Sequence, residues 1–198
     1  MTRLAVITAA ERHTQLTEWN PTGEHDGEPD LIERFTTVVR ADPDAPAVTH
    51  AGRTLSYREL DAASRRLAAR LTARGAGPED RVALLLPRSP LAVVAIVGVL
   101  RAGAAYVPID PRYPTDRIAY TLADAAPAAV LTTAEHADEP ALRGHPVLTL
   151  AEDGDPLESE AAAPKAAAPE AAAPARAGGP APAHPEHAAY LIYTSGST

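Results

Sequence analysis

The sequence predicts an α/β fold with a mainly parallel sheet and flanking helices. Short, continuous apolar runs alternate with segments whose apolar residues recur at helical spacing, and capping residues or glycines separate the two kinds of segment. A parallel strand covered on both faces is apolar throughout, whereas a surface helix carries one apolar stripe. The alternation therefore favours units in which a helix connects two parallel strands.

The composition restricts the class of protein. A chain of 198 residues with 45% hydrophobic residues is long enough for one globular domain, or for one domain and a tail. The net charge is −8 and no run is basic, which argues against binding to nucleic acid or to an anionic membrane. The absence of cysteine excludes disulfides, thiolate metal sites and cysteine nucleophiles.

Membrane insertion and export are also disfavoured. The longest apolar run, residues 90–100, lies between Arg88 and Arg101 and is shorter than the roughly 18–20 residues that span a bilayer. The N-terminus has one basic residue and a short apolar patch, without the longer apolar region of a signal peptide. We therefore expect a cytoplasmic protein.

The expected elements run through most of the chain. They are a short helix within residues 4–19, a helix from residue 31, a hairpin of 47–50 and 53–55, helices at 57–74, 90–102 and 115–123, and strands at 81–86, 104–109, 128–132, 146–150 and 188–193.

Periodicity and turn residues support the first of these elements. A polar leader ends in a strong turn at residues 20–23. Apolar residues then recur at spacings of three and four from residue 31, which predicts an amphipathic helix, and Pro43 ends it. The dipeptide Ala51-Gly52 separates two short runs and predicts a β-hairpin.

Capping residues delimit the longer helices. Ser56 and Glu59 have the spacing of a capping box, and Gly75 suits the C-cap of the helix that follows. The pair Ser89-Pro90 favours the start of the next helix, and Gly103 ends it. This helix is apolar nearly all round, which predicts that it is buried, as does the continuous apolar run of the strand before it.

An Ala/Pro-rich tract interrupts the pattern after residue 150. Residues 161–175 contain three near repeats of a five-residue unit with one proline in each. Proline lacks the amide hydrogen that a helix needs, and the tract has few large apolar residues to offset the entropy of ordering. We interpret residues 151–187 as a low-complexity linker or surface loop.

The five residues at the end of the sequence are the strongest candidate for a binding site. Hydroxyls and backbone amides surround a flexible glycine here, in Thr194, Ser195, Gly196, Ser197 and Thr198. Such a loop after a strand can wrap phosphate oxygens. Runs of this composition are also common as solvated linkers, and no lysine or helix N-terminus follows to face the anion, so composition leaves both interpretations open.

Two other candidates have simpler explanations. His184 and His187 have a spacing compatible with a metal pair, but Pro185 lies between them without a third ligand, which favours solvated histidines. Asp110 precedes Pro111 at the carboxyl edge of the sheet, where α/β proteins bind ligands, although an ordinary strand exit is the favoured interpretation. No catalytic or metal-ligating residue is assigned.

Three motifs, in order, resemble the adenylation domain of nonribosomal peptide synthetases, within the adenylate-forming, AMP-binding ligase superfamily. Residues 55–60 (LSYREL) match the first core motif of the family, and residues 100–110 (LRAGAAYVPID) match the second almost position for position. Residues 189–198 (AYLIYTSGST) match the beginning of the third, the ATP phosphate loop. Residues 11–20 are similar to the linker that follows a condensation domain.

The resemblance implies an incomplete N-terminal subdomain of an adenylate-forming enzyme, because the sequence stops within the phosphate-loop motif. The Ala/Pro-rich tract is longer and simpler than the segment usual at this place. The implied divisions are a leader at 1–30, a partial adenylation domain at 31–150, the linker at 151–187, and a strand with the truncated phosphate loop at 188–198.

The family reaction joins an amino acid to ATP, giving aminoacyl-AMP and pyrophosphate, and then transfers the acyl group to a phosphopantetheine thiol on a carrier domain. The resemblance thus implies ATP and Mg as cofactors, bound by Thr194, Ser195, Gly196, Ser197 and Thr198, and phosphopantetheine on a partner rather than on this chain. The implied partners are the amino acid, the remaining adenylation-domain segments, and condensation and carrier domains. Alone, the chain is expected to be inactive.

Three hypotheses remain at this point. The chain is part of a peptide synthetase, the front of a stand-alone acyl- or aryl-adenylating ligase, or a non-catalytic interaction fragment with a proline-rich arm. The leader that resembles a condensation-domain linker argues against the second hypothesis. A nucleotide sequence that continues past Thr198 with Gly, Pro and Lys codons favours the first two, and a stop codon favours the third.

Overall fold

The computed structural model describes residues 7–20, 29–151, 154 and 186–194. The elements are α1 (Ala9–His13), the π-helical turn η1 (Thr14–Glu18), α2 (Leu31–Ala41), β1 (Pro46–His50), β2 (Arg53–Ser56), α3 (Tyr57–Ala73), β3 (Arg81–Leu85), α4 (Pro90–Arg101), β4 (Ala105–Ile109), α5 (Thr115–Ala125), β5 (Ala129–Thr133), the 3₁₀ turns η2 (Ala134–His136) and η3 (Pro140–Leu142), and β6 (Val147–Leu150).

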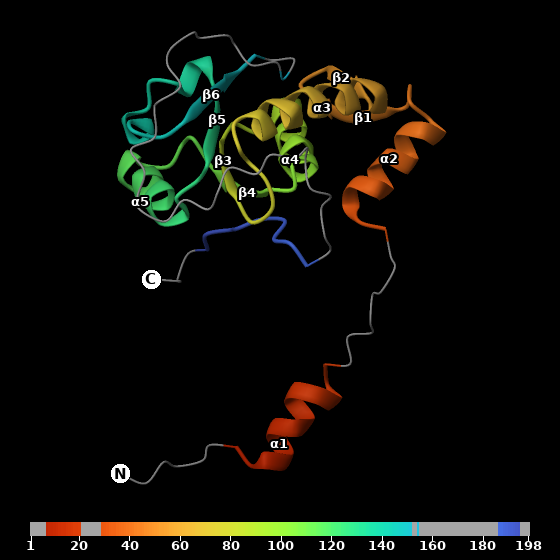
Figure 1. The fold of residues 1–198 in the computed structure, drawn as a ribbon, viewed down its shortest axis with the longest axis vertical. Coiled ribbons are helices and arrows are strands. Elements are labelled where there is room, and N and C mark those ends of the chain that lie inside the picture. The colour runs from red at the N-terminus through yellow and green to blue at the C-terminus, as the bar shows by residue number, and fades with distance from the viewer. Residues whose placement is uncertain (1–6, 21–28, 152–153, 155–185, 195–198) are drawn as a thin grey trace.

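The centre of the fold is a four-stranded sheet in the order β4-β3-β5-β6, with every neighbouring pair parallel. The connection through α4 leads from β3 to one neighbour, and the connection through α5 returns past β3 to the other (Figure 1). The antiparallel hairpin β1-β2 forms a separate small sheet. The α/β fold with a mainly parallel sheet is therefore confirmed.

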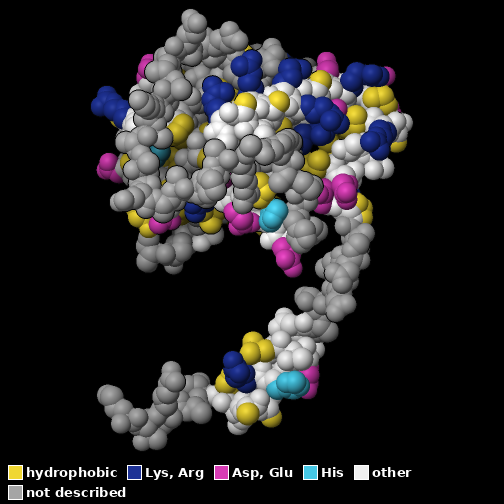
Figure 2. Space-filling view, in the orientation of Figure 1, with side chains coloured by type: hydrophobic (Ala, Val, Ile, Leu, Met, Phe, Trp, Pro, Cys, Tyr) yellow, Lys and Arg dark blue, Asp and Glu magenta, His cyan; other side chains and the backbone are white. Residues whose placement is uncertain are grey.

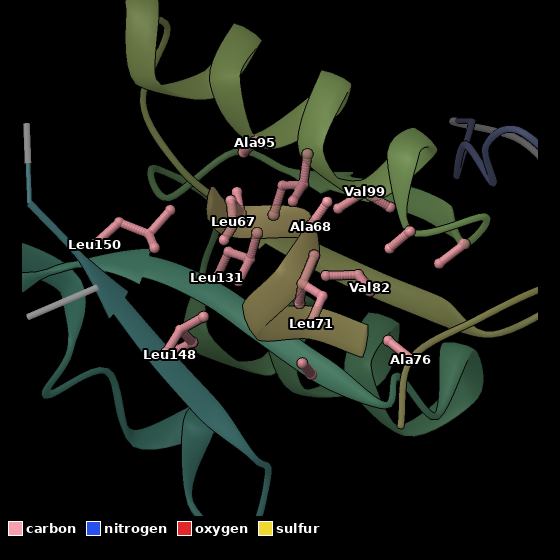
Figure 3. Close-up of a cluster of buried hydrophobic side chains, with 14 of the residues drawn as sticks. Leu67, Ala68, Leu71, Ala76, Val82, Ala95, Val99, Leu131, Leu148 and Leu150 are labelled. Carbon is pink, nitrogen blue, oxygen red and sulfur yellow. The ribbon is translucent and has the colours of Figure 1, made fainter. Parts of the chain in front are cut away.

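One face of the sheet packs against α3 and α4. Leu67 and Leu71 of α3 and Val99 of α4 are fully buried, and they meet Leu131 of β5 and Leu148 of β6 (Figure 3). The expected burial of α4 is confirmed, since most of its residues between Pro90 and Val99 are inaccessible to solvent. Burial of this apolar surface supplies most of the stabilisation of the layer.

The opposite face of the sheet packs against α5 and η3. Ile118 and Leu122 of α5 join Val107 of β4, Val130 of β5 and Leu142 of η3 in a second buried cluster. Because the strands have buried side chains on both faces, their sequences are continuously apolar rather than alternating. The sheet is thus the middle layer of three.

The capping residues act as the sequence predicts. Ser56 Oγ accepts a hydrogen bond from the amide of Glu59 at 3.3 Å, and the Glu59 carboxylate accepts one from the Ser56 amide at 2.8 Å. Ser89 Oγ accepts from the first turn of α4. Gly75 and Gly103 follow α3 and α4 with φ of 89° and 79°, a left-handed conformation that costs glycine little.

The bounds of most elements differ from the expected ones by one or two residues. Helix α5 continues to Ala125, past the expected residue 123, because Ala126 ends it in a left-handed conformation with φ of 43°. In the leader, the expected short helix within residues 4–19 is confirmed as α1, which passes into a π-helical turn, and Trp19 after it is 72% exposed. Gly154 is buried against Val94, so packing reaches past residue 150 into the expected linker.

Many arginines lie on the face of the molecule that Figure 2 shows, several of them on the side where α3 and the hairpin lie. The solvent face of α3 contributes Arg58, Arg65, Arg66 and Arg70. Within the described ranges, no helix combines the length and the apolar character needed to cross a bilayer.

Candidate functional site: the segment leading into the serine-rich loop

The segment of residues 186–194 lies along the outer edge of β4 (Figure 1). It makes one parallel bridge, between Tyr190 and Tyr106. The Tyr106 amide donates to the Ala189 carbonyl at 3.1 Å, and the Leu191 amide donates to the Tyr106 carbonyl at 3.0 Å. The prediction of a strand over residues 188–193 is therefore only partly correct, because this segment pairs with β4 at a single bridge.

Pro108 explains why the pairing stops. In a parallel ladder the next hydrogen bond from β4 comes from the amide two residues after Tyr106, and that residue is a proline without an amide hydrogen. Pro108 is exposed on β4, as is usual for proline in an edge strand. The segment consequently depends on other contacts to hold it against the sheet.

Two side chains from the rest of the protein, Glu79 and Asp124, bind the two ends of this segment. At its start, the Ala188 amide donates to Glu79 Oε1 at 3.0 Å. At its end, the hydroxyl of Tyr193 donates to Asp124 Oδ2, near the C-terminus of α5, at 2.6 Å. The rings of Tyr106 and Tyr190 also lie in contact, with centroids 5.8 Å apart.

Tyr193 is half-buried and packs against the cluster between α5 and the sheet. Burial and the hydrogen bond to Asp124 raise the pKa of the Tyr193 phenol to about 12. The phenol therefore remains protonated at neutral pH and acts as a donor to a carboxylate, which is a strong, charge-assisted hydrogen bond.

The structure describes one of the five candidate phosphate-binding residues. Thr194 follows Tyr193 directly and is exposed. Ser195, Gly196, Ser197 and Thr198 lie outside the described residues. The position of Thr194 at the carboxyl end of a segment docked beside a parallel sheet is compatible with the start of a phosphate-binding loop.

Asp110 is engaged in the turn after β4. Its carboxylate accepts from the Arg112 amide at 3.0 Å and from Arg112 Nη2 at 2.6 Å. These hydrogen bonds lower the pKa of Asp110 to about 2, so that it stays ionised through the physiological range. The contacts fit a residue that fixes a strand exit, which is the favoured interpretation of the sequence.

The histidine pair receives no support as a metal site. His184 lies outside the described residues, and His187 is half-buried at the start of the docked segment. Across the part of the chain that the structure describes, no group of three or more His, Cys, Asp or Glu side chains is arranged to hold a metal ion.

The family described as AMP-binding enzyme matches residues 35–198, most of the chain. The chain belongs to this family. Among solved structures, the nonribosomal peptide synthetase FmoA3 in its AMPPNP-bound form is 35% identical, with a TM-score of 0.60, over 72% of this chain and 15% of that chain. A long-chain-fatty-acid CoA ligase described as putative, from Rhodopseudomonas palustris, is 29% identical, with a TM-score of 0.54, over 60% of this chain and 30% of that chain.

Sequence relatives narrow the assignment within the family. Surfactin synthase subunit 3 of Bacillus subtilis is 41% identical over 195 residues, which are 98% of this chain and 14% of the relative. The AMB antimetabolite synthetase AmbB of Pseudomonas aeruginosa is 44% identical over 168 residues, which are 85% of this chain and 12% of the relative. The chain is thus part of a nonribosomal peptide synthetase adenylation domain, and it spans a small fraction of the length of these relatives.

The sequence did not predict which residues hold the docked segment. Glu79 and Asp124 are 109 and 69 residues from the groups that they bind, and no local pattern reports such a pairing. Pro108 was a usable signal, because a proline in the run 104–109 predicts an edge strand with interrupted pairing.

Proposed function

We propose that this chain forms the front part of a domain that activates an amino acid. In the complete domain, a carboxylate oxygen of the amino acid attacks the α-phosphorus of MgATP and pyrophosphate leaves, which gives aminoacyl-AMP. The acyl group then passes to the phosphopantetheine thiol of a carrier domain. The observation that carries the proposal is the family match over residues 35–198, which includes the docked segment of residues 186–194.

Within this reaction, the role of the chain is to position phosphate groups. Thr194, Ser195, Gly196, Ser197 and Thr198 offer hydroxyls and backbone amides to the β- and γ-phosphates of ATP, and Mg accompanies the nucleotide. These contacts orient the triphosphate and neutralise charge on the departing pyrophosphate, without forming a covalent bond. The AMPPNP-bound form of a structural neighbour supports the use of a nucleoside triphosphate.

The proposal assigns the remaining parts of the sequence as well. Residues 1–30 serve as the leader after a condensation domain, residues 31–150 as the partial adenylation domain, and residues 151–187 as the connection to the docked segment. Condensation and carrier domains, and the rest of the adenylation domain, are the partners. A stand-alone ligase is less favoured, because relatives that match 98% of this chain are peptide synthetases.

A hybrid enzyme tests this function. Residues 1–198 replace the matching segment of surfactin synthase subunit 3, and amino-acid-dependent exchange between ATP and pyrophosphate is measured. The hybrid is expected to exchange. Replacing either Thr194 or Ser197 singly by alanine is expected to raise the KM for MgATP about tenfold to a hundredfold, because one hydrogen bond to a charged group contributes about 1.5–3 kcal/mol.

The matched control is Thr54→Ala, which removes a hydroxyl from the exposed hairpin. It is expected to leave the KM for MgATP unchanged. A folded hybrid without exchange contradicts the proposal, and so does a loop variant whose KM equals that of the control.

A further inference from the structure

The contacts that hold residues 186–194 differ in kind along the segment. In the middle, backbone hydrogen bonds join Tyr106 to Ala189 and Leu191. Such hydrogen bonds fix the register of the segment along the edge strand, but any sequence with free backbone amides can form them. The contact at the C-terminal end is made by two side chains, Tyr193 and Asp124.

The end contact lies where the pairing with β4 has already stopped. Within residues 186–194, the Tyr190 bridge is the last backbone pairing with β4, and Pro108 lacks the amide hydrogen for the next one. Between this bridge and Thr194, the hydrogen bond from Tyr193 to Asp124 at 2.6 Å attaches the segment to α5. Leu191 and Ile192 are exposed, so their side chains add little to the attachment.

We propose that Tyr193 and Asp124 form a positioning pair, which holds the first residue of the phosphate loop at a fixed place against α5. This inference rests on the proposed function of Thr194–Thr198 in binding phosphate. The hydroxyl of Tyr193 is engaged by Asp124. Tyr193 acts through the backbone of the residue that follows it, by limiting the positions from which the loop begins.

The physical reason is pre-organisation. A loop whose base is fixed loses less conformational freedom on binding phosphate, so more of the contact energy appears as affinity. The aromatic ring of Tyr193 is packed against the cluster beside α5, and the hydroxyl is tied to a carboxylate. Rotation and translation of this side chain are therefore both restricted, and the Thr194 backbone adjoins it.

Three variants of the 198-residue chain test the pair. Tyr193→Phe removes the hydroxyl and keeps the ring, and Asp124→Asn removes the charge of the acceptor. Tyr120→Phe is the matched control, because this tyrosine lies on the same helix and is 58% exposed. The first readout is hydrogen exchange at the Leu191 amide, with the buried Val82 of β3 as an internal reference.

Tyr193→Phe and Asp124→Asn are each expected to accelerate exchange at Leu191 about tenfold, and the double variant is expected to exchange no faster than either single variant. Tyr120→Phe and the reference amide are expected to remain unchanged. Unaltered exchange at Leu191 in Tyr193→Phe overturns the proposal, as does acceleration that spreads equally to Val82.

A spectroscopic titration separates the hydrogen bond from simple packing. The groups that act on the Tyr193 phenol are Asp124 and Tyr120 from α5 and Arg81 from β3. Asp124→Asn is expected to lower the pKa of Tyr193 from about 12, while burial keeps it above the ordinary 10.0. A pKa of Tyr193 that does not move in Asp124→Asn contradicts the pair.

The last readout connects the pair to phosphate. Magnesium tripolyphosphate is titrated into the chain, and NMR shifts of Thr194–Thr198 report binding. Tyr193→Phe is expected to weaken this binding severalfold while the thermal midpoint stays near that of Tyr120→Phe. Equal affinity in Tyr193→Phe and wild type overturns the positioning role. A wild-type chain without response overturns the proposed phosphate loop instead, while the exchange data still decide whether the pair holds the segment.

Discussion

Replacing Asp61 by asparagine is expected to destabilise the fold more than any loss of a surface ion pair. Asp61 of α3 accepts from Arg65 Nε at 2.8 Å and also from Arg101 of α4. The side chains of Asp61 and Arg101 are 16% and 9% exposed. The Asp61 carboxylate thus links α3 to α4, and the Arg101 guanidinium also lies over the ring of Phe35 of α2, 5.4 Å from its centroid.

The expected loss of stability follows from the burial of the Asp61–Arg101 ion pair. Burial lowers the pKa of Arg101, which shows that its charge is poorly solvated, and Asp61 offsets this effect. Removing one partner of a buried pair leaves an uncompensated charge, at a cost of about 3–5 kcal/mol. Because Asp61 retains some contact with water, we expect Asp61→Asn to lower the free energy of unfolding by about 3 kcal/mol, near the lower end of this range.

Urea unfolding followed by circular dichroism measures the change. With a slope of about 1–3 kcal/mol/M, the midpoint is expected to fall by about 1–3 M. Asp44→Asn is the control, because the Arg58–Asp44 pair is 63% and 78% exposed and such pairs contribute less than about 1 kcal/mol. Equal midpoints for Asp61→Asn and Asp44→Asn would refute the reasoning.

Other positions give independent predictions. Arg112→Gln is expected to raise the pKa of Asp110 from about 2 toward 3.8, which a carbon-13 NMR titration measures. The substitution also removes a contribution to folding stability that is present above pH 3.8 and lost as the pH falls toward 2. Gly98→Ala brings a Cβ within 2.9 Å of the buried side chain of Leu67. The resulting overpacking costs about 1–3 kcal/mol, which is expected to exceed the gain in helix propensity of about 1 kcal/mol, so the thermal midpoint is expected to fall. Ser56→Ala is expected to cost about 1 kcal/mol in urea unfolding through the lost cap of α3, whereas Thr8→Ala, at the cap of an α1 without buried residues, is expected to leave the midpoint unchanged.

Local chemistry accounts for the part of the fold that the sequence predicts. A capping box at Ser56, a proline after Ser89 and glycines at 75 and 103 each act within one turn of chain, so their effect is visible without tertiary structure. Continuous apolar runs likewise reveal strands that are buried on both faces. These signals were sufficient for the order of the elements and for the parallel sheet.

Contacts between distant parts of the chain explain what the sequence missed. The Tyr193–Asp124 and Arg101–Asp61 pairs join residues 69 and 40 positions apart, and neither leaves a periodic pattern. Ala126 ends α5 in a left-handed conformation that favours glycine, so composition gives no sign of that boundary. In the candidate site, the motif identifies Tyr193 and Thr194, but only the structure shows what holds them.

Amino-acid-dependent exchange between ATP and pyrophosphate, measured with Mg on the 198-residue chain, tests the central claim most directly. We propose that this chain supplies the start of a phosphate loop, while other segments of the domain supply the remaining substrate contacts. Ordering five loop residues costs about 1–2 kcal/mol each, which offsets much of the gain from a few phosphate hydrogen bonds. The predicted result is no exchange above a no-enzyme control for any common amino acid, and clear exchange with any one of them would contradict the account.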